Sequence, residues 1–112
     1  MDEKILVTLR MAVRPEKRSS LLKTLRGMLE PARVERGCLS YRLYEDVENE
    51  NIFFLVEEWK TQKDLEGHIR TDNQRRLLGL MDFMSEQPEL SYNTVSHTAG
   101  MELIEDVLHR TR

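Results

Sequence analysis

The sequence predicts an α+β domain built from four strands and two main helical segments. Apolar residues alternate in four separate stretches, which is typical of strands, and recur at helical spacing between them. Gly, Pro, Asn and Thr residues separate these stretches, as expected at turns and helix ends. Because 112 residues suit one domain, we expect a single domain over 1–112, with a core over about 4–98 and a helical extension over about 100–110.

The first half of the chain predicts a strand followed by a helix. Residues 4–13 alternate, which places Ile5, Val7, Leu9, Met11 and Val13 on one strand face. Pro15 suits the first turn of a helix, and Gly37 predicts its end. The apolar stripe of this helix comprises Leu21, Leu25, Met28, Leu29 and Ala32.

A hairpin follows. Alternation over residues 38–46 and 52–60 predicts two strands, and the polar run Glu48–Asn51 predicts the turn between them. In the second of these strands, Phe53, Leu55, Glu57 and Trp59 share one face.

The second half of the chain predicts two short helices and a last strand. Thr61 is a candidate N-cap for a helix to about Arg70, and Thr71 or Asp72 for the next helix, which Pro88 ends. Its buried stripe is Leu77, Leu80, Met81 and Met84. Residues 90–98 alternate as a fourth strand, and an amphipathic helix follows Gly100.

This order of elements is that of a ferredoxin-like fold, an antiparallel sheet with helices on one face. The other face is then uncovered and carries apolar groups beside opposite charges. Such a mixed surface indicates a partner, so we expect a homodimer through this open face. Its residues are Leu6, Arg10, Arg42, Tyr44, Phe54, Val56 and Glu58.

Composition narrows the function classes. The net charge is −3 with acids and bases interspersed, so we expect no nucleic-acid partner, and Arg70, Arg75 and Arg76 are interpreted as a solvated helix face. The single cysteine, Cys38, predicts a reducing cytoplasmic location. No apolar run reaches the roughly 20 residues of a membrane span. No cysteine or histidine motif predicts a metal site.

Several residues together form a recognisable pattern. Gly37 and Cys38 follow the first helix, Tyr41 lies on the next strand, and a Glu-x-Trp motif is formed by Glu57 and Trp59. A histidine, His68, follows Trp59 by nine residues. In this ordered set the chain resembles the antibiotic-biosynthesis monooxygenase family over about residues 4–98.

The resemblance implies a dimeric α+β barrel with a pocket between sheet and helices. It implies no cofactor, and a monooxygenase that acts on an aromatic or quinol-like small molecule. We expect His68 to be the catalytic base, because imidazole titrates near neutrality and can remove a phenol proton. Expected pocket residues are Glu57, Trp59 and Tyr41, together with the family positions occupied here by Leu9 and Asn73.

The chain departs from the family pattern at some positions. Asn73 stands where a second His often follows the first. Haem-degrading members carry an Asn, a Trp and an axial His where this chain has Leu9, His68 and Leu78, which argues against haem. Glu57 on an apolar face should be hydrogen-bonded, paired or protonated, because an unpaired buried carboxylate is costly.

Three functions remain open at this point. An oxygenase predicts an apolar pocket containing His68, Trp59 and Tyr41. A non-catalytic binding or stress-response dimer predicts a pocket filled by Met81, Phe83 and Met84, with His68 on the surface. An isomerase of a small phosphorylated metabolite requires that Arg70, Arg75 and Arg76 converge on the pocket.

Overall fold

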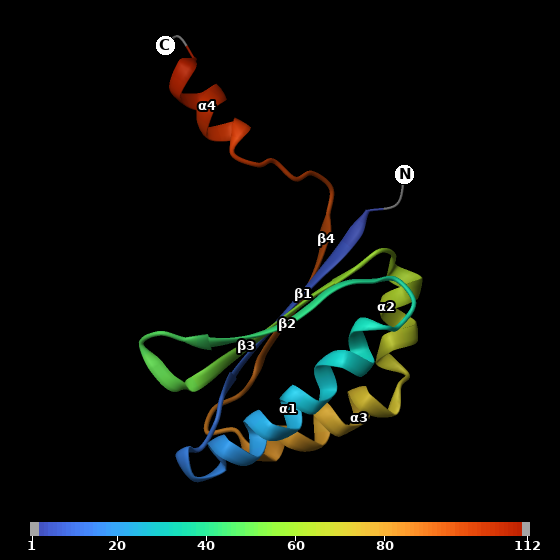
Figure 1. The fold of residues 1–112 in the computed structure, drawn as a ribbon, viewed down its shortest axis with the longest axis vertical. Coiled ribbons are helices and arrows are strands. Elements are labelled where there is room, and N and C mark those ends of the chain that lie inside the picture. The colour runs from blue at the N-terminus through green and yellow to red at the C-terminus, as the bar shows by residue number, and fades with distance from the viewer. Residues whose placement is uncertain (1–2, 111–112) are drawn as a thin grey trace.

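The computed structural model describes residues 3–110 and has the predicted ferredoxin-like fold. Four antiparallel strands lie in the order β2-β3-β1-β4, and three helices cover one face of the sheet (Figure 1). The strands are β1 (Lys4–Ala12), β2 (Cys38–Asp46), β3 (Asn49–Trp59) and β4 (Glu89–Val95). The covering helices are α1 (Arg18–Arg33), α2 (Gln62–Ile69) and α3 (Asp72–Gly79).

The two central strands carry the core and one side of the site. On β1 the side chains of Ile5, Val7, Leu9 and Met11 are buried, and on β3 those of Phe53, Leu55, Glu57 and Trp59. The antiparallel register places Val7 opposite Glu57 and Leu9 opposite Leu55. A carboxylate therefore lies within an otherwise apolar face, as the alternation predicts.

Helix α1 buries Leu21, Leu25, Met28 and Ala32 against the sheet, which confirms the predicted stripe except for Leu29, which is only partly buried. Its end was predicted incorrectly, because the helix ends at Arg33 and Gly37 lies in the loop beyond it. Gly37 has a φ of +79°, and a Cβ there would collide with the side chain of Asp64 on α2. Glycine is needed here because the loop packs directly against α2 in a left-handed conformation.

Three other boundaries differ from the prediction. The hairpin turns at Val47–Glu48, and β3 begins at Asn49, because Asp46 and Asn49 side chains accept backbone N–H bonds two residues on. Helix α3 ends at Gly79 and continues as a short 3₁₀ helix, Leu80–Phe83, well before Pro88. Strand β4 ends at Val95 rather than 98.

The last helix, α4 (Glu102–His109), projects away from the body of the protein (Figure 1). It buries no residue, and Leu103, Ile104 and Val107 are each about half exposed. The N-terminal η1 segment (Pro15–Lys17) lies at the opposite end of the fold (Figure 1). In residues 3–110, no helix has both the length and the apolar character needed to span a membrane.

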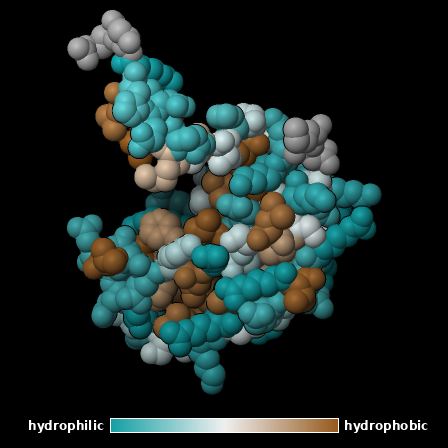
Figure 2. Space-filling model, turned by 45° about the horizontal axis from the view of Figure 1, so that its top comes forward, coloured by the Kyte–Doolittle hydropathy of each residue, from teal (hydrophilic) through white to brown (hydrophobic). Residues whose placement is uncertain are grey.

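The open face of the sheet has the mixed character that the sequence predicts. Leu6, Phe54 and Val56 are partly buried there, and Tyr44 is 48% exposed. Arg10 pairs with Glu86 and Glu89 at 3.2 Å. Figure 2 shows apolar groups gathered below the projecting tail and interspersed with hydrophilic side chains.

Candidate functional site

Hydrogen bonds at both ends of helix α2 fix the backbone position of His68. The Thr61 hydroxyl accepts the N–H of Asp64 at 3.1 Å and caps the N-terminus, as predicted. At the other end, the Thr71 hydroxyl donates to the His68 carbonyl at 2.7 Å and caps α3 by accepting the N–H of Gln74. The backbone of His68 is therefore fixed between two capped helices.

The imidazole ring is clamped by two aromatic side chains. Trp59 stacks on it with ring centroids 4.5 Å apart and planes inclined by 28°, and Tyr41 meets it edge-on at 5.6 Å. All three side chains are at least 98% buried. Trp59, Tyr41 and His68 thus form one packed group, in which the ring has little freedom to turn.

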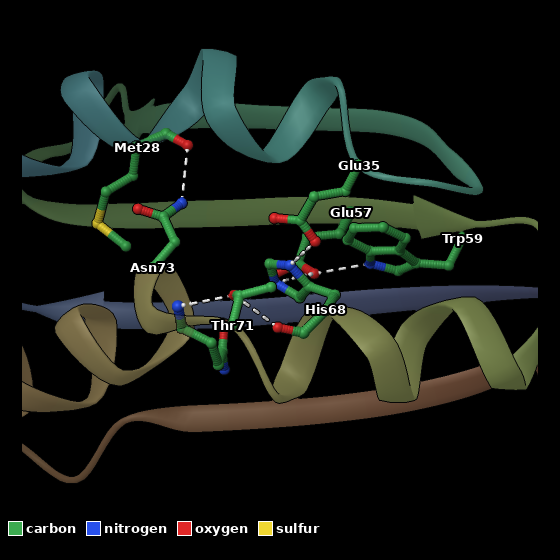
Figure 3. A network of polar contacts seen from close by, with 8 residues as sticks. Met28, Glu35, Glu57, Trp59, His68, Thr71 and Asn73 are labelled. Atoms are coloured by element: carbon green, nitrogen blue, oxygen red, sulfur yellow. Dashed lines mark hydrogen bonds and ion pairs between the residues drawn. The ribbon is translucent and has the colours of Figure 1, made fainter.

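Each nitrogen of the His68 ring faces a carboxylate, as Figure 3 shows. Nδ1 lies 2.8 Å from Oε1 of Glu35, which comes from the loop after α1. Nε2 lies 3.6 Å from Oε1 of Glu57 and has no hydrogen-bond partner although it is buried. Because a carboxylate can only accept, this distance makes Nδ1 the donor to Glu35, and whenever the ring is neutral Nε2 then keeps its lone pair.

Glu57 is the buried carboxylate that the sequence singled out. Its Oε1 accepts the indole N–H of Trp59 at 2.9 Å. Burial raises the pKa of Glu57, the Trp59 hydrogen bond and the positive charge of His68 in its protonated form lower it, and Glu35 raises it further. The net direction is upward, so this carboxyl group holds a proton more firmly than an ordinary glutamate.

A cavity of about 310 Å³ opens beside His68 and Glu57, between the β1–β4 side of the sheet and helices α2 and α3. Apolar side chains supply most of its wall, and its other polar groups are Gln74, Gln87 and Tyr92. Burial, and secondarily Glu57, raise the pKa of the Tyr92 hydroxyl. Leu78, Leu90 and Tyr92 are each about half exposed or more, so they form the open side of the cavity.

The sequence-predicted site residues divide into two groups. Leu9, Glu57 and His68 line the cavity. Trp59 and Tyr41 do not; they pack against the His68 ring and hold it.

Asn73 is turned away from the cavity. Its side chain donates to the Met28 carbonyl at 3.2 Å and ties α3 to α1 (Figure 3).

The three arginines do not converge on the cavity. Arg70, Arg75 and Arg76 are exposed and absent from its wall, and Arg75 pairs with Asp72 at 2.9 Å. His68 is 2% exposed, so the surface position that a filled pocket predicts is also wrong.

Sequence reasoning missed Glu35, Gln74 and Tyr92. No periodic pattern marks Glu35, whose partner lies 33 residues away. The nearest signal was Gly37, because a left-handed glycine indicates close approach of its loop to another element.

The cavity wall bears on cofactor binding. Leu9 and Leu78, the positions from which the sequence argued against haem, both line the cavity, and neither side chain has an atom that could bind iron. Among residues 3–110, no group of three His, Cys, Asp or Glu side chains is placed to hold a metal ion.

Fold and site together define a small α+β protein with an apolar cavity that ends at a buried imidazole. The family of antibiotic biosynthesis monooxygenases matches residues 4–78, and the chain belongs to this family. The matched segment contains β1 to α3, and with them His68, Glu57 and Glu35.

Individual relatives agree with this assignment. The chain is 30% identical to the uncharacterized protein sll1783 of Synechocystis over 80% of its own length and 56% of that protein. It is 36% identical to a Bacillus subtilis protein named "Putative monooxygenase YcnE" over 53% of its length and 62% of that protein. The matches thus span less than two thirds of these two relatives.

A solved structure extends the likeness of fold. The structure of Rv0793 from Mycobacterium tuberculosis superposes with a TM-score of 0.79, covering 87% of this chain and 99% of that one at 24% identity. At this identity the likeness establishes the fold alone.

Proposed function

We propose that this protein is a cofactor-independent monooxygenase that acts on a phenol or quinol of one or two rings. The observation that carries the proposal is the buried, unpartnered Nε2 of His68 beside an apolar cavity. Membership of the monooxygenase family supports the reaction class. The chemistry of the cavity supports the proposed substrate class.

The cavity fits a small, flat, mostly apolar ligand. Ligand sites commonly have volumes of about 300–1,000 Å³, and about 310 Å³ lies at the lower end of that range. Its apolar lining favours an aromatic ring, and the few polar groups would orient one or two hydroxyls. Without an arginine on the wall, a phosphorylated ligand would lack a counter-charge, so the isomerase alternative loses its support.

His68 acts in this proposal as a base that first takes and later returns a proton. Nε2 removes the phenol proton, and the phenolate is a far better electron donor to O₂ than the neutral phenol. A bond forms between oxygen and a ring carbon that bears hydrogen, para to the hydroxyl in a phenol or ortho to it in a quinol, giving a peroxide that the imidazolium protonates. Loss of the C–H proton then breaks the O–O bond and leaves a quinone and water.

The atoms and electrons of this reaction balance without a further reductant. A phenol with a free para position plus O₂ gives a quinone plus H₂O, and a quinol with a free ortho position plus O₂ gives a hydroxyquinone plus H₂O. The phenol supplies four electrons, one oxygen atom enters the carbonyl and the other leaves as water. The protein supplies orientation, exclusion of water and a proton acceptor, which are the roles that its buried site suits.

Oxygen uptake with a panel of phenols and quinols tests the proposal. His68→Gln should lower the protein-dependent rate by about 100-fold or more, which is the usual contribution of a general base. His97→Gln is the matched control, because His97 is exposed beyond β4. Uptake that His68→Gln leaves unchanged would contradict the proposal, and saturable binding without uptake would favour the non-catalytic binding dimer.

We also propose that the protein is a cytoplasmic homodimer in which the open sheet faces pack together. The partly buried Leu6, Phe54 and Val56 support this arrangement, because apolar side chains among opposite charges suit a protein interface. Tyr44 and the pair between Lys4 and Glu58, at 3.4 Å, would lie at its margin. The single cysteine supports the location.

A further inference from the structure

His68 separates two hollows of the molecule. On one side lies the apolar cavity. On the other lies a polar cleft between the loop after α1 and the start of α2, whose lining includes Glu35, Lys60, Lys63 and Asp64. His68 lines both hollows, although it is 2% exposed. The Glu35 side chain is 18% exposed and borders the polar cleft.

The contacts of Glu35 determine which nitrogen of His68 is free. Its Oε1 binds Nδ1 at 2.8 Å, a distance typical of a charge-assisted hydrogen bond. The stacked Trp59 and the edge-on Tyr41 prevent the ring from turning to exchange its nitrogens. The proton of the neutral ring is therefore held on the Glu35 side, and the lone pair faces Glu57.

The loop conformation keeps Glu35 in this place. Gly37, with its φ of +79°, lies against Asp64, and its carbonyl accepts the N–H of Lys60 at 2.8 Å. The Cys38 N–H also binds the Glu35 carbonyl at 3.1 Å. The hydrogen bonds of Gly37 and Cys38, at the start of β2, thus fix the backbone that carries the Glu35 carboxylate.

An unpartnered Nε2 also needs an explanation, because buried polar atoms nearly always have a hydrogen-bond partner. The nearest carboxylate oxygen, of Glu57, lies 3.6 Å away and already accepts the Trp59 N–H. A hydroxyl group of a ligand in the adjoining cavity would supply the missing partner. The lone pair of Nε2 can thus accept a hydrogen bond from a hydroxyl group of a ligand in the cavity.

We propose that Glu35 is the positioning residue of the site: it holds the Nδ1 proton of His68, leaves Nε2 as the acceptor, and stabilises the imidazolium once a phenol has given up its proton. In that transfer the ligand O–H bond breaks and an Nε2–H bond forms. The ligand becomes −1 and His68 becomes +1 beside the −1 of Glu35. The inference rests on the proposed function for the identity of the ligand, but not for the Glu35–His68 pair.

Other titratable groups surround the same ring. They come from every element packed against it: Glu57 from β3, Tyr41 and Cys38 from β2, and Tyr92 from β4 across the cavity. Burial raises the pKa values of Tyr41 and Cys38, and the two glutamates raise them further, so both side chains stay neutral. Of the two glutamates beside the ring, Glu35 lies nearer, 2.8 Å from Nδ1 against 3.6 Å from Nε2 for Glu57, so Glu35 carries the counter-charge of the imidazolium.

The test uses 4-nitrophenol, whose phenolate absorbs visible light and whose neutral form does not. Binding is measured by equilibrium dialysis, and the ionised fraction of the bound probe by its absorbance, at a pH where the free probe is mostly neutral. Wild type should bind it as the phenolate. Glu35→Gln should bind it mainly as the neutral phenol, with a ratio of phenolate to phenol about tenfold lower or more.

Two further variants make the comparison specific. Glu35→Asp keeps the charge and should restore most of the bound phenolate. Glu30→Gln is the matched control, since Glu30 is exposed on α1 and pairs with Arg33 at 2.7 Å, and it should behave as wild type. Equal ionisation of the probe in wild type and Glu35→Gln would overturn the role of Glu35 while leaving the proposed function intact.

A probe that fails to bind wild type would count against the proposed phenol ligand instead. The Glu35–His68 pair is then tested alone by ¹⁵N NMR of the imidazole nitrogens in the free protein. Wild type should show a protonated Nδ1 and a bare Nε2, and Glu35→Gln a mixture of both tautomers. A wild-type ring protonated on Nε2 would overturn the inference, and this reading stands even if Glu35→Gln fails to fold.

Discussion

Glu57 and Glu58 are neighbours in the sequence, yet the fold gives them opposite environments. Glu57 lies on the covered face of β3, 4% exposed, with the Trp59 N–H and the His68 ring against it. Glu58 lies on the open face and pairs with Lys4 at 3.4 Å, each of the two side chains being 34% exposed. Because successive side chains of a strand point to opposite faces, two adjacent glutamates can belong one to the candidate site and the other to the open surface.

Phe53 and Phe54, four residues earlier on β3, show the same contrast. Phe53 is 1% exposed in the core, where the Arg18 guanidinium lies 5.3 Å from its ring, whereas Phe54 is only partly buried on the open face. Side chains of the covered face therefore form both the hydrophobic core that stabilises the fold and the proposed reaction site. The open face is left for a partner.

The largest expected effect comes from truncating these two phenylalanines. Phe53→Ala should lower the free energy of unfolding by about 3–5 kcal/mol, because it opens a cavity in the core. Phe54→Ala, the matched change on the open face, should cost about 1 kcal/mol in the monomer. Urea denaturation at low protein concentration measures both values. Equal losses would mean that the two faces are not distinguished as described.

A charge on the open face should affect assembly rather than folding. Val56→Lys places a cation opposite Arg42 in the β2–β3 register, so burying it between two sheets would be costly. We expect the dimer to dissociate about 100-fold more readily, as measured by sedimentation equilibrium. Val47→Lys is the control, because Val47 is fully exposed in the hairpin turn. A Val56→Lys protein that assembles like wild type would contradict the proposed interface.

The pH dependence of stability should distinguish the two glutamates. The folded-state pKa of Glu57 is raised, chiefly by burial, above its unfolded value of about 4.3. The stability contributed by its neutral carboxyl is therefore fully present below about pH 4.3 and is lost as the pH rises through the folded pKa. Glu57→Gln cannot ionise, so the stability of wild type relative to this variant should fall as the pH increases.

Glu58→Gln provides the reference for that experiment. It removes one partner of a partly exposed pair, so the expected change is below about 1 kcal/mol. Denaturant titrations at a series of pH values measure both differences. A wild-type stability that rises with pH relative to Glu57→Gln would reverse the sign and refute the buried, proton-retaining description of Glu57.

The smallest expected effect on folding comes from deleting residues 99–112. Helix α4 buries none of its residues, so the unfolding free energy of the monomer should change by less than about 0.5 kcal/mol. If the tail crosses to a partner, the same deletion should weaken the dimer. Sedimentation that the deletion leaves unchanged would rule out the crossing, and a large loss of monomer stability would show that α4 packs on its own chain.

Periodicity predicted most of the fold because it depends on local geometry. The alternation in β1 and β3, the stripe of α1 and the Thr61 and Thr71 caps are all confirmed, since each follows from spacing within a few residues. Boundaries were less accurate. The side chains of Asp46 and Asn49 moved the hairpin turn forward, and the α1 helix ended without glycine.

The site was predictable only in part, because its contacts join distant segments. Strand parity correctly put Glu57, Trp59 and Leu9 on the covered face, but it cannot tell which of them reaches a cavity and which supports the ring from behind. Glu35 comes from a loop without any period, and only the packing of that loop against α2 brings it to His68.

Ligand mapping by NMR tests the central claim, that the covered face holds the small-molecule site, most directly. Titration of ¹⁵N-labelled protein with 1-naphthol, followed by backbone amide shifts, locates the bound ring. We expect saturable shifts around the cavity, at Leu9, His68, Leu77 and Tyr92, with Tyr44 and Phe54 unchanged. Shifts confined to the open face, or no saturable shift at the cavity with either naphthol or a simple quinol, would contradict it.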